Sequence, residues 1–401
     1  MSDTRKSTKP NVPNLRFPGF EGEWARCTLG EIGEPYIGLT YSPADVVSEG
    51  GTIVFRSSNI QNGEIDYSDI VRVNKIIKDS IITRKDDLLI CARNGSPRLI
   101  GKNALLKEAD EGQTFGAFML VFRSNDNHFV HQLLCTKGYN SQVSENLGAR
   151  INQITTSNIR DFEFCFPQST AERNKIAGFL DLIDERIAVQ SRLIDRLQSL
   201  IKGINRTIFT GSGLEYSLCD VCEIRSGYSG NQLQGGKGLG VSRIETISAH
   251  NINLERIGYV APFDASENYR LQVGDILFSN INSVEYIGNT AFIDKDYNLY
   301  HGMNLLRLIP FRNVVVPFYL YILLNTNRML KHFKTICNKA VSQASINQKE
   351  LGKTIVMLPS LEKQKQVCNI YQAMYSKLKT EKDVLSFYQE QKRYLLRHMF
   401  I

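Results

Sequence analysis

Residues 176–208, IAGFLDLIDERIAVQSRLIDRLQSLIKGINRTI, place an apolar side chain at every third or fourth position, with one interruption at Gln190. The same run of steps returns 191 residues later in VCNIYQAMYSKLKTEKDVLSFYQEQKRYLLRHM (367–399), where the polar Glu381 aligns with Gln190. Steps of three and four residues are typical of a helix that buries a narrow stripe against a second helix. Two copies of one interrupted stripe at a single offset indicate an internal duplication.

We expect the two helices to pair with each other in antiparallel orientation. The segment between them joins the end of the first helix to the start of the second, and the termini of a domain usually lie close together. Pairing of each stripe with another protein remains an alternative. The predicted stripe positions are Ile176, Leu180, Ile183, Ile187, Ile194, Leu197, Ile201 and Ile204 in the first helix, and Val367, Tyr371, Met374, Leu378, Leu385, Tyr388 and Leu395 in the second.

A β-rich segment precedes each helix. Alternating stretches such as DDLLICARNGS (86–96) and GDILFSNINS (274–283) are bounded by turn-forming residues and predict short strands. Asp87 aligns with Asp275, and the tripeptide Ile-Asn-Gln at 151–153 aligns with the same tripeptide at 346–348. Each helix start follows a proline, and Ser169 with Glu172 has the spacing of a capping box.

The pattern therefore predicts an α+β fold: two β-rich domains in a pseudo-twofold tandem repeat, joined by two long helices that form an antiparallel coiled coil. The expected boundaries are a disordered tail at 1–14, a first domain at 15–166, a first helix at 167–210, a second domain at 211–358 and a second helix at 359–401.

Composition favours a globular protein with a polyanionic partner. Lys and Arg number 48 against 41 Asp and Glu, giving a net charge of +7, which suits a nucleic acid without requiring one. The first residues lack the apolar core of a secretory signal, and the most apolar stretch, 314–324, is too short to span a bilayer. Eight scattered cysteines form no disulfide framework. We expect a cytoplasmic protein that makes no membrane contact.

Motifs for catalysis are absent or imperfect. No Pro-Pro pair, which an adenine methyltransferase motif would require, occurs in the chain. The glycines of GGKGLGV (235–241) follow no apolar strand, and the phosphate-loop look-alike at 95–102 has five residues between its glycines where four are needed. Cys219 and Cys222 form a lone CxxC in a segment with a strand-like pattern, which favours core cysteines over zinc ligands. We expect no catalytic residues and no bound metal.

The opening LRFPGFEGEW (15–24), the segment INQITTSNIRDFEFCFP (151–167) and the proline-led heptad helices resemble the DNA-specificity subunit of type I restriction–modification systems, over about residues 15–401. The resemblance implies a non-catalytic subunit whose two target-recognition domains each recognise one half of a split, asymmetric DNA site, while the helices set the spacer. It also implies double-stranded DNA, two methylation subunits and two restriction subunits as partners. S-adenosylmethionine would bind the methylation subunit, ATP and magnesium the restriction subunit, and no cofactor this chain.

DNA recognition requires polar and cationic side chains on loops, some directed at base edges and others at phosphates. Two segments in each domain supply them, although a solvated loop that caps a strand is the alternative for each residue. The candidates are Arg93, Asn94, Ser96, Arg98, Lys102, Arg150, Asn152 and Gln153 in the first domain, and Asn280, Asn282, Ser283, Ser342, Gln343, Ser345 and Asn347 in the second. A stand-alone adenine-specific DNA methyltransferase and a coiled-coil scaffold without DNA affinity remain the alternative functions.

Overall fold

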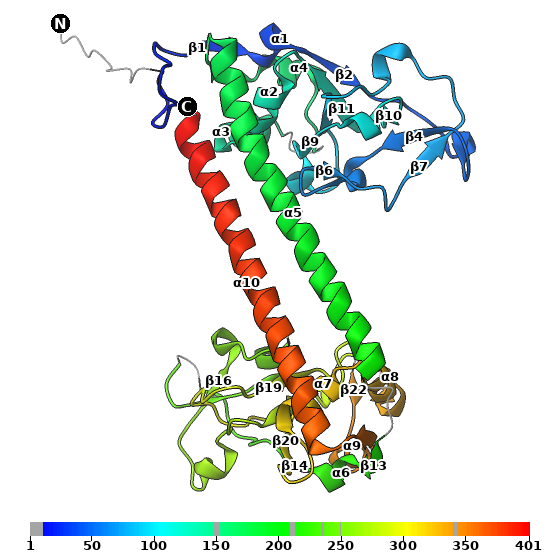
Figure 1. The fold of residues 1–401 in the computed structure, drawn as a ribbon, viewed down its shortest axis with the longest axis vertical. Coiled ribbons are helices and arrows are strands. Elements are labelled where there is room, and N and C mark those ends of the chain that lie inside the picture. Colours follow the sequence, from blue (N-terminus) through cyan, green and yellow to red (C-terminus); the bar gives the residue numbers. More distant parts are fainter. Residues whose placement is uncertain (1–10, 148–151, 209–212, 234–235, 249, 340–342) are drawn as a thin grey trace, which may run out of the picture. The chain divides into compact units, whose positions relative to one another are not determined.

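The computed structural model describes residues 11–147, 152–208, 213–233, 236–248, 250–339 and 343–401 (Figure 1). The chain divides into two compact units, Met1–Leu193 with Glu381–Ile401, and Ile194–Thr380. Each unit contains one β-rich domain and a part of each long helix. No helix in the described part of the chain is long and apolar enough to cross a membrane.

The first domain contains twelve strands and four short helices in the described residues. They are β1 (Ala25–Thr28), α1 (Leu29–Ile32), β2 (Glu34–Ile37), β3 (Val46–Val47), β4 (Thr52–Phe55), β5 (Ile60–Gln61), β6 (Glu64–Ile65), β7 (Val71–Val73), β8 (Leu88–Cys91), β9 (Asn103–Leu105), β10 (Thr114–Phe115), β11 (Met119–Arg123), α2 (Asn127–Leu133), α3 (Lys137–Asn146), α4 (Thr156–Asp161) and β12 (Glu163–Phe166). The long helix α5 (Thr170–Ile208) follows.

The second domain contains eleven strands and four short helices in the described residues. Its elements are β13 (Leu214–Ser217), α6 (Leu218–Val221), β14 (Cys222–Ser226), β15 (Leu239–Val241), β16 (Gly258–Val260), β17 (Ile276–Phe278), β18 (Ile281–Asn282), β19 (Thr290–Phe292), β20 (Leu306–Pro310), α7 (Pro317–Leu324), α8 (Asn327–Ile336), β21 (Asn338–Lys339), β22 (Ala344–Ser345), α9 (Gln348–Gly352) and β23 (Ile355–Leu358). The long helix α10 (Leu361–Met399) follows.

Both domains are built on the same four-stranded antiparallel sheet. Its strand order is β2-β11-β8-β9 in the first domain and β14-β20-β17-β19 in the second. The first and last strands of each domain also pair, as β1 with β12 and β13 with β23. The first domain adds a second sheet, β10-β4-β7-β3. The repeated topology confirms the predicted duplication and the α+β fold.

Strand β8 shows why the sequence of this sheet has an apolar run. Leu88 and Ile90 belong to the core that includes α2 and α5, whereas Leu89 and Cys91 belong to the core beneath the second sheet. Alternate side chains of a strand point to opposite faces, so a strand buried on both faces has no polar positions. The run DLLIC therefore forms the centre of the first domain.

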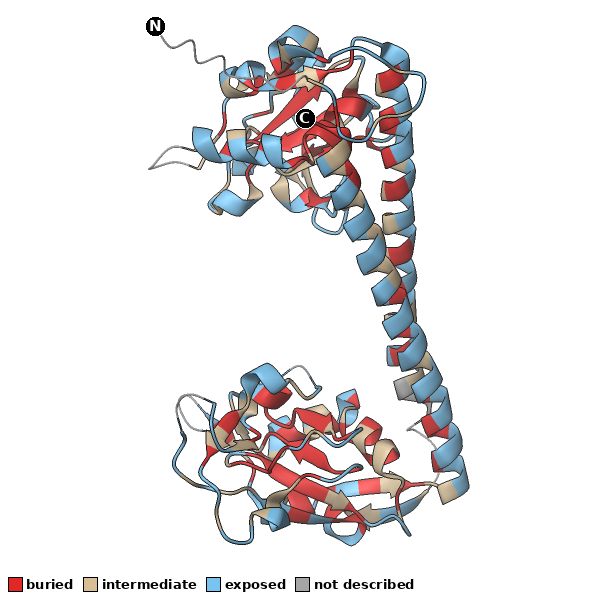
Figure 2. Cartoon of the chain, turned by 90° about the vertical axis from the view of Figure 1, so that its left-hand side faces the viewer, coloured by how far each residue is buried: buried red, intermediate tan, exposed pale blue. Residues whose placement is uncertain are grey.

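The long helices pair in antiparallel orientation within the first unit. Gln190 of α5 contacts Glu381 of α10. Asp184, which lies earlier in α5, contacts Lys392, which lies later in α10. Buried residues form a stripe along both helices (Figure 2). Of the predicted stripe residues, Ile176, Leu180, Ile183, Ile194, Ile201, Val367, Tyr371, Leu378 and Leu395 are buried, and Ile187, Leu197, Ile204, Met374, Leu385 and Tyr388 are half-buried.

The interruption shared by the two stripes is a buried polar contact. The Gln190 amide donates a hydrogen bond to the backbone carbonyl of Glu381 (3.0 Å) and another to its carboxylate. These two residues occupy equivalent positions in the two copies of the repeat. The polar positions of both stripes therefore satisfy each other inside the seam.

The opening segment of the chain anchors both long helices, a role that its sequence alone did not indicate. Arg16 forms a two-pronged ion pair with the buried Glu172 of α5, at 2.7 and 2.9 Å. Trp24 packs edge-on against Phe400, beside the end of α10. The capping-box prediction is half wrong. The backbone N–H group of Glu172 does donate to the hydroxyl oxygen of Ser169, but the Glu172 carboxylate binds Arg16.

Cys219 and Cys222 do not both lie in the core, contrary to expectation. Cys219 is exposed on α6, and Cys222 is buried at the start of β14. The segment begins with one helical turn because Asp220 accepts a hydrogen bond from the backbone N–H of Ser217 (3.0 Å). That turn directs only one of the two thiols inward.

The contact between the first domain and both long helices is polar at its centre. On α2, Gln132 donates hydrogen bonds of 2.8 Å to both Asp181 and Asp184 of α5. Lys392 of α10 lies 2.5 Å from the second oxygen of Asp184. His128 of α2 lies 2.6 Å from Asp181. One network thus ties α2, α5 and α10 together within the first unit.

Two histidines of α2 respond to this network in opposite directions. The hydrogen bond to Asp181 raises the pKa of His128 above its usual 6.5, although burial opposes it. Burial, assisted by the charge of Lys392, lowers the pKa of His131 to about 4. A raised histidine pKa means that the proton stabilises the fold, and a lowered one means that the proton destabilises it.

We predict that replacing Gln190 with Leu lowers the stability of the helix pair by about 1–3 kcal/mol, because the buried Glu381 side chain loses its amide donor. The double variant Q190L/E381L should recover most of this loss, since two apolar residues can replace a buried polar pair at little cost. Calorimetric unfolding would measure both, with R192A on the exposed side of α5 as control. An unchanged melting temperature for Q190L would contradict the prediction.

A second prediction concerns pH. The stabilisation from protonated His128 is complete below about pH 6.5 and disappears as the pH rises through its higher folded pKa. The penalty for protonating His131 grows as the pH falls from about 6.5 towards 4. The melting temperature of the unit that contains the first domain should therefore decline both as the pH rises above about 6.5 and as it falls below about 6.5. H128Q should flatten only the alkaline decline, whereas H250N, at an exposed histidine of the second unit, should leave both unchanged.

Candidate nucleic-acid interface

The two candidate segments of the first domain lie side by side. Arg93 and Gln153 form an antiparallel bridge, although sixty residues separate them. The N–H group of Asn94 donates to the carbonyl of Asn152 (3.3 Å), and the Asn152 amide donates to the carbonyl of Gly95 (3.1 Å). The fold thus combines two separate polar loops into one surface. Arg150 lies outside the described residues.

The second domain joins its two segments in the same way. Strand β18 pairs with β22, so that Ile281 faces Ser345 and Asn282 faces Ala344. The amide of Asn280 donates to the carbonyl of Ile346 (3.3 Å). Ser342 lies outside the described residues.

The hydrogen bonds correct the alignment of the two copies. Ile154 donates to the carbonyl of Ala92, and Ile346 donates to the carbonyl of Asn280, both at 2.9 Å. Ile154 is therefore the counterpart of Ile346, three residues away from the match that the shared Ile-Asn-Gln tripeptide suggested. Under this alignment Ile281 takes the place of Arg93, and the first domain presents a cation where the second presents an apolar side chain.

Several candidate side chains shape the loops. The Asn94 amide donates to the hydroxyl of Ser57 (2.8 Å), and its oxygen accepts from the N–H group of Ser96 (3.1 Å). Asn282 repeats this arrangement with Ser279 and Ser283. Such internal bonds fix the loop backbone, so these amides position other groups.

Asn347 has a helix-capping role. Its side chain accepts the N–H group of Glu350 (2.8 Å) at the start of α9, as Thr155 accepts that of Asn158 at the start of α4. A cap satisfies one of the free N–H groups of a helix start. The remaining candidates with exposed or half-buried side chains are Arg93, Ser96, Arg98, Lys102, Asn152 and Gln153 in the first domain, and Ser283, Gln343 and Ser345 in the second.

A pocket of about 1090 Å³ opens beside the joined loops of the first domain. Its walls include Tyr41, Arg56, Arg93 and Phe118. The Arg93 guanidinium lies over the ring of Phe118, 4.9 Å from its centre. Tyr41, Arg56 and Phe118 were not predicted from the sequence, because they come from three other turns that only the folded sheets bring together.

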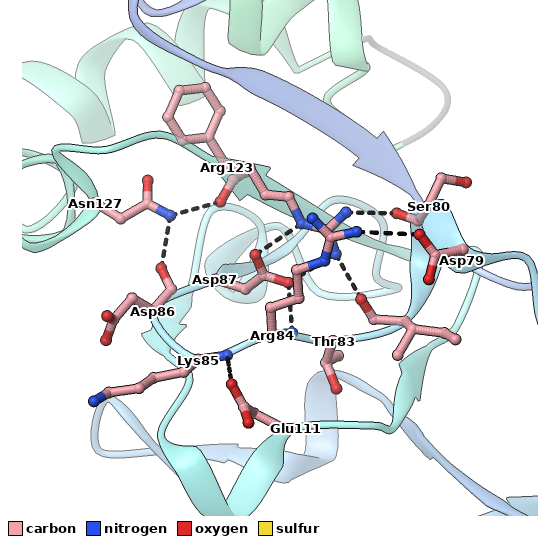
Figure 3. Close-up of polar contacts among 12 residues, drawn as sticks. Asp79, Ser80, Thr83, Arg84, Lys85, Asp86, Asp87, Glu111, Arg123 and Asn127 are labelled. Atoms are coloured by element: carbon pink, nitrogen blue, oxygen red, sulfur yellow. Dashed lines mark hydrogen bonds and ion pairs between the residues drawn. The ribbon is translucent and has the colours of Figure 1, made fainter.

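The strand that carries the Arg93 loop is fixed at its other end by an ion pair. Arg123, at the end of β11, donates to both carboxylate oxygens of the buried Asp87 at 2.8 and 2.9 Å, and to the carbonyls of Ser80 and Ile82 (Figure 3). In the second domain Asp275, the counterpart of Asp87, pairs with Arg307 at 2.6 Å. Because the strand is fixed at this end, the loop at its other end is held in a defined position.

One group of side chains has the composition of a metal site. The ligand atoms of His131, Asp181 and Asp184 lie within 4.8 Å of one another. The carboxylates are already bonded to Gln132 and to the ammonium group of Lys392, which supplies the positive charge that a cation would bring. This arrangement is that of a structural ion-pair network.

Comparison with known proteins identifies one family in both halves of the chain. A family model described as the type I restriction modification DNA specificity domain matches residues 21–199 and again 214–386. Each match covers one β-rich domain and much of the helix after it.

Individual relatives agree with the family match. The putative type I restriction enzyme MjaX specificity subunit of Methanocaldococcus jannaschii is 38% identical over 187 residues, which is 46% of this chain but only 44% of that protein. The EcoKI specificity subunit of Escherichia coli is 24% identical over 389 residues, covering 88% of this chain and 82% of that subunit. The crystal structure of the type I restriction–modification S subunit from M. genitalium has the same fold, with a TM-score of 0.64, 19% identity and coverage of 97% and 99% of the two chains.

Proposed function

The chain belongs to the type I restriction–modification DNA specificity family, and from this premise we propose that each of its β-rich domains recognises one half of a split, asymmetric DNA site. One observation carries the proposal: in both domains, two polar loops that are far apart in sequence are joined by antiparallel backbone pairing. This pairing joins equivalent positions in the two domains, and the side chains on the loops differ between the copies. Two unlike half-sites are the expected result.

The paired helices suit the role of a spacer. Helix α5 and helix α10 each contain 39 residues, or roughly 58 Å at 1.5 Å per residue. DNA-binding units that contact one face of the duplex recognise half-sites about one helical turn, roughly 34 Å, apart. A stiff pair of helices fixes such a distance better than a flexible linker.

The proposal assigns recognition to this chain and chemistry to its partners. Two methylation subunits would carry S-adenosylmethionine, and two restriction subunits would carry ATP and magnesium. This chain would bind no cofactor and would act in the cytoplasm, where the DNA is. The absence of a methyltransferase motif from the sequence supports this division.

We further propose the surface to which a methylation subunit binds. On α5, Leu182, Val189 and Leu193 are spaced seven and four residues apart and lie exposed beside the buried stripe. On α10, Phe387 and Tyr394 are spaced seven residues apart and are 66% and 58% exposed.

The heptad geometry places these two rows together. In an antiparallel pair, the positions that flank the seam on one side of the first helix adjoin those of the second. The opposite flank, which holds Asp181, Asp184 and Lys392, is covered by α2 of the first domain. The exposed rows therefore lie on the side of the helix pair away from α2, and exposed apolar side chains of this kind mark a protein-binding surface.

The main proposal predicts the outcome of a domain exchange. Residues 15–166 would be replaced by the first domain of a family member with a different recognition sequence. Single-molecule sequencing of methylated adenines, with the methylation subunit co-expressed, should show one half-site changed, and the other half-site and the spacer unchanged. An unaltered recognition sequence would refute the proposal.

The proposed surface for the methylation subunit predicts a defect in the binding of that subunit. The double variant L182D/V189D should weaken binding of the methylation subunit at least tenfold, because two carboxylates would be buried without partners. The control R192E changes charge on the outer side of the same helix and should bind normally. Calorimetric titration would measure the affinities, and equal binding by both variants would exclude this face.

A further inference from the structure

Arg93 differs from the other cations around the pocket of the first domain. Its guanidinium lies over the ring of Phe118 and is bonded to no acceptor among the described residues. Arg56, the other cation in the pocket wall, donates to the backbone carbonyl of Asp69 (3.1 Å) and to its carboxylate (2.8 Å). Arg93 is therefore the wall cation that remains available for an external acceptor.

The contact with Phe118 leaves the N–H donors at the edge of the guanidinium open. A guanidinium carries its N–H donors in its plane, and an aromatic ring covers only a face of that plane. Stacking also restricts the rotamers of a long side chain, which reduces the entropy lost on binding. The ring thus holds the donor fork in one orientation without occupying it.

The backbone of Arg93 is fixed on both sides. Its N–H group and that of Ala92 donate to the carbonyl of Phe118, at 3.0 and 2.9 Å. The bridge to Gln153 holds the other side. The backbone that carries Arg93 is consequently fixed at the pocket, and the exposed ring of Phe118 lies beside its guanidinium.

We propose that Arg93 recognises a guanine in the half-site of the first domain and that Phe118 positions it. A planar fork of donors matches the O6 and N7 acceptors of guanine in the major groove. Adenine presents an amino donor at the equivalent of O6 and would oppose the fork. This inference rests on the proposed DNA-recognition function.

The two copies provide an internal comparison. Ile281, which takes the place of Arg93 in the second domain, cannot donate a side-chain hydrogen bond. The guanine contact therefore belongs to one half-site, and loss of Arg93 leaves the other half-site intact.

Arg98 serves as the matched control. It lies five residues further along the same loop, in the short turn Pro97–Leu99, and is exposed. It stacks on no aromatic ring in the described part of the chain. An exposed cation of this kind is suited to a phosphate contact, which adds affinity without sequence information.

The test compares the parent with R93A, R93K, F118L and R98A, each co-expressed with the methylation subunit, by sequencing methylated adenines. R93A and R93K should accept other bases at one guanine position of one half-site, with discrimination there reduced about 5- to 150-fold. F118L should show a smaller reduction at the same position. R98A should keep the recognition sequence and bind DNA more weakly, with a salt dependence lower by about one ion.

Three outcomes decide the matter. An unchanged recognition sequence in R93A, or relaxation at an A·T pair or in the other half-site, overturns the inference and leaves the proposed function intact. Failure of the domain exchange to alter the sequence overturns the proposed function itself. If R93A abolishes methylation, competition binding with DNA substituted at each position decides, because the parent but not R93K should discriminate at one guanine.

Discussion

The pairing of α5 with α10 is the interaction on which the rest of the structure depends. A helix of 39 residues with an apolar stripe on one side has no stable place in water unless that stripe is buried. In an antiparallel pair of duplicated helices, equivalent residues meet only near the midpoint, and Gln190 and Glu381 are equivalent residues that meet. A shift of one heptad would set Gln190 against Tyr388 or Met374 and separate it from the carboxylate of Glu381. The shared interruption therefore fixes the register of the pair.

The first domain uses the same helices as part of its own core. Ile176, Leu180 and Leu395 pack in one cluster with Trp24 and Phe129. Beside this apolar cluster, the network of Gln132, Asp181, Asp184 and Lys392 joins the domain to both helices through charges that are paired. Apolar packing is tolerant of small rotations, whereas hydrogen bonds of 2.5–2.8 Å are not. The combination gives the domain a defined orientation on the helices beside it.

The sequence predicted the parts of the structure that depend on local periodicity. The heptad stripes, the duplication and the buried strands around Asp87 and Asp275 all follow from residue spacing, and the family match agrees with them. It did not predict partners that are distant in sequence. Glu172 has the spacing of a capping residue but binds Arg16, and Lys392 interrupts the second stripe because Asp184 lies opposite it.

The candidate site shows the same limit. The repeated tripeptide at 151–153 and 346–348 suggested an alignment that the hydrogen bonds of Ile154 and Ile346 shift by three residues. Phe118 could not be connected with Arg93 from sequence, because the contact depends on the pairing of β11 with β8. The sequence pattern identifies loops that can bind DNA. The choice of base depends on which loop side chains are free to contact the DNA and which are bonded to the loop backbone.

Divergence after duplication follows from this division between frame and loop. A mutation in β8 or β17 alters a strand that is buried on both faces, and so it changes the core as well as the loop. A change from Arg93 to Ile281 alters a side chain at a solvent-exposed or half-buried edge and leaves the bridge beneath it in place, since the bridge is formed by backbone groups. Asn94 and Asn282 stayed alike, and each braces its loop by hydrogen bonds to two serines, although the serines are not equivalent in the two copies. The positions free to change are therefore those whose side chains face outward from a backbone that the sheet already holds.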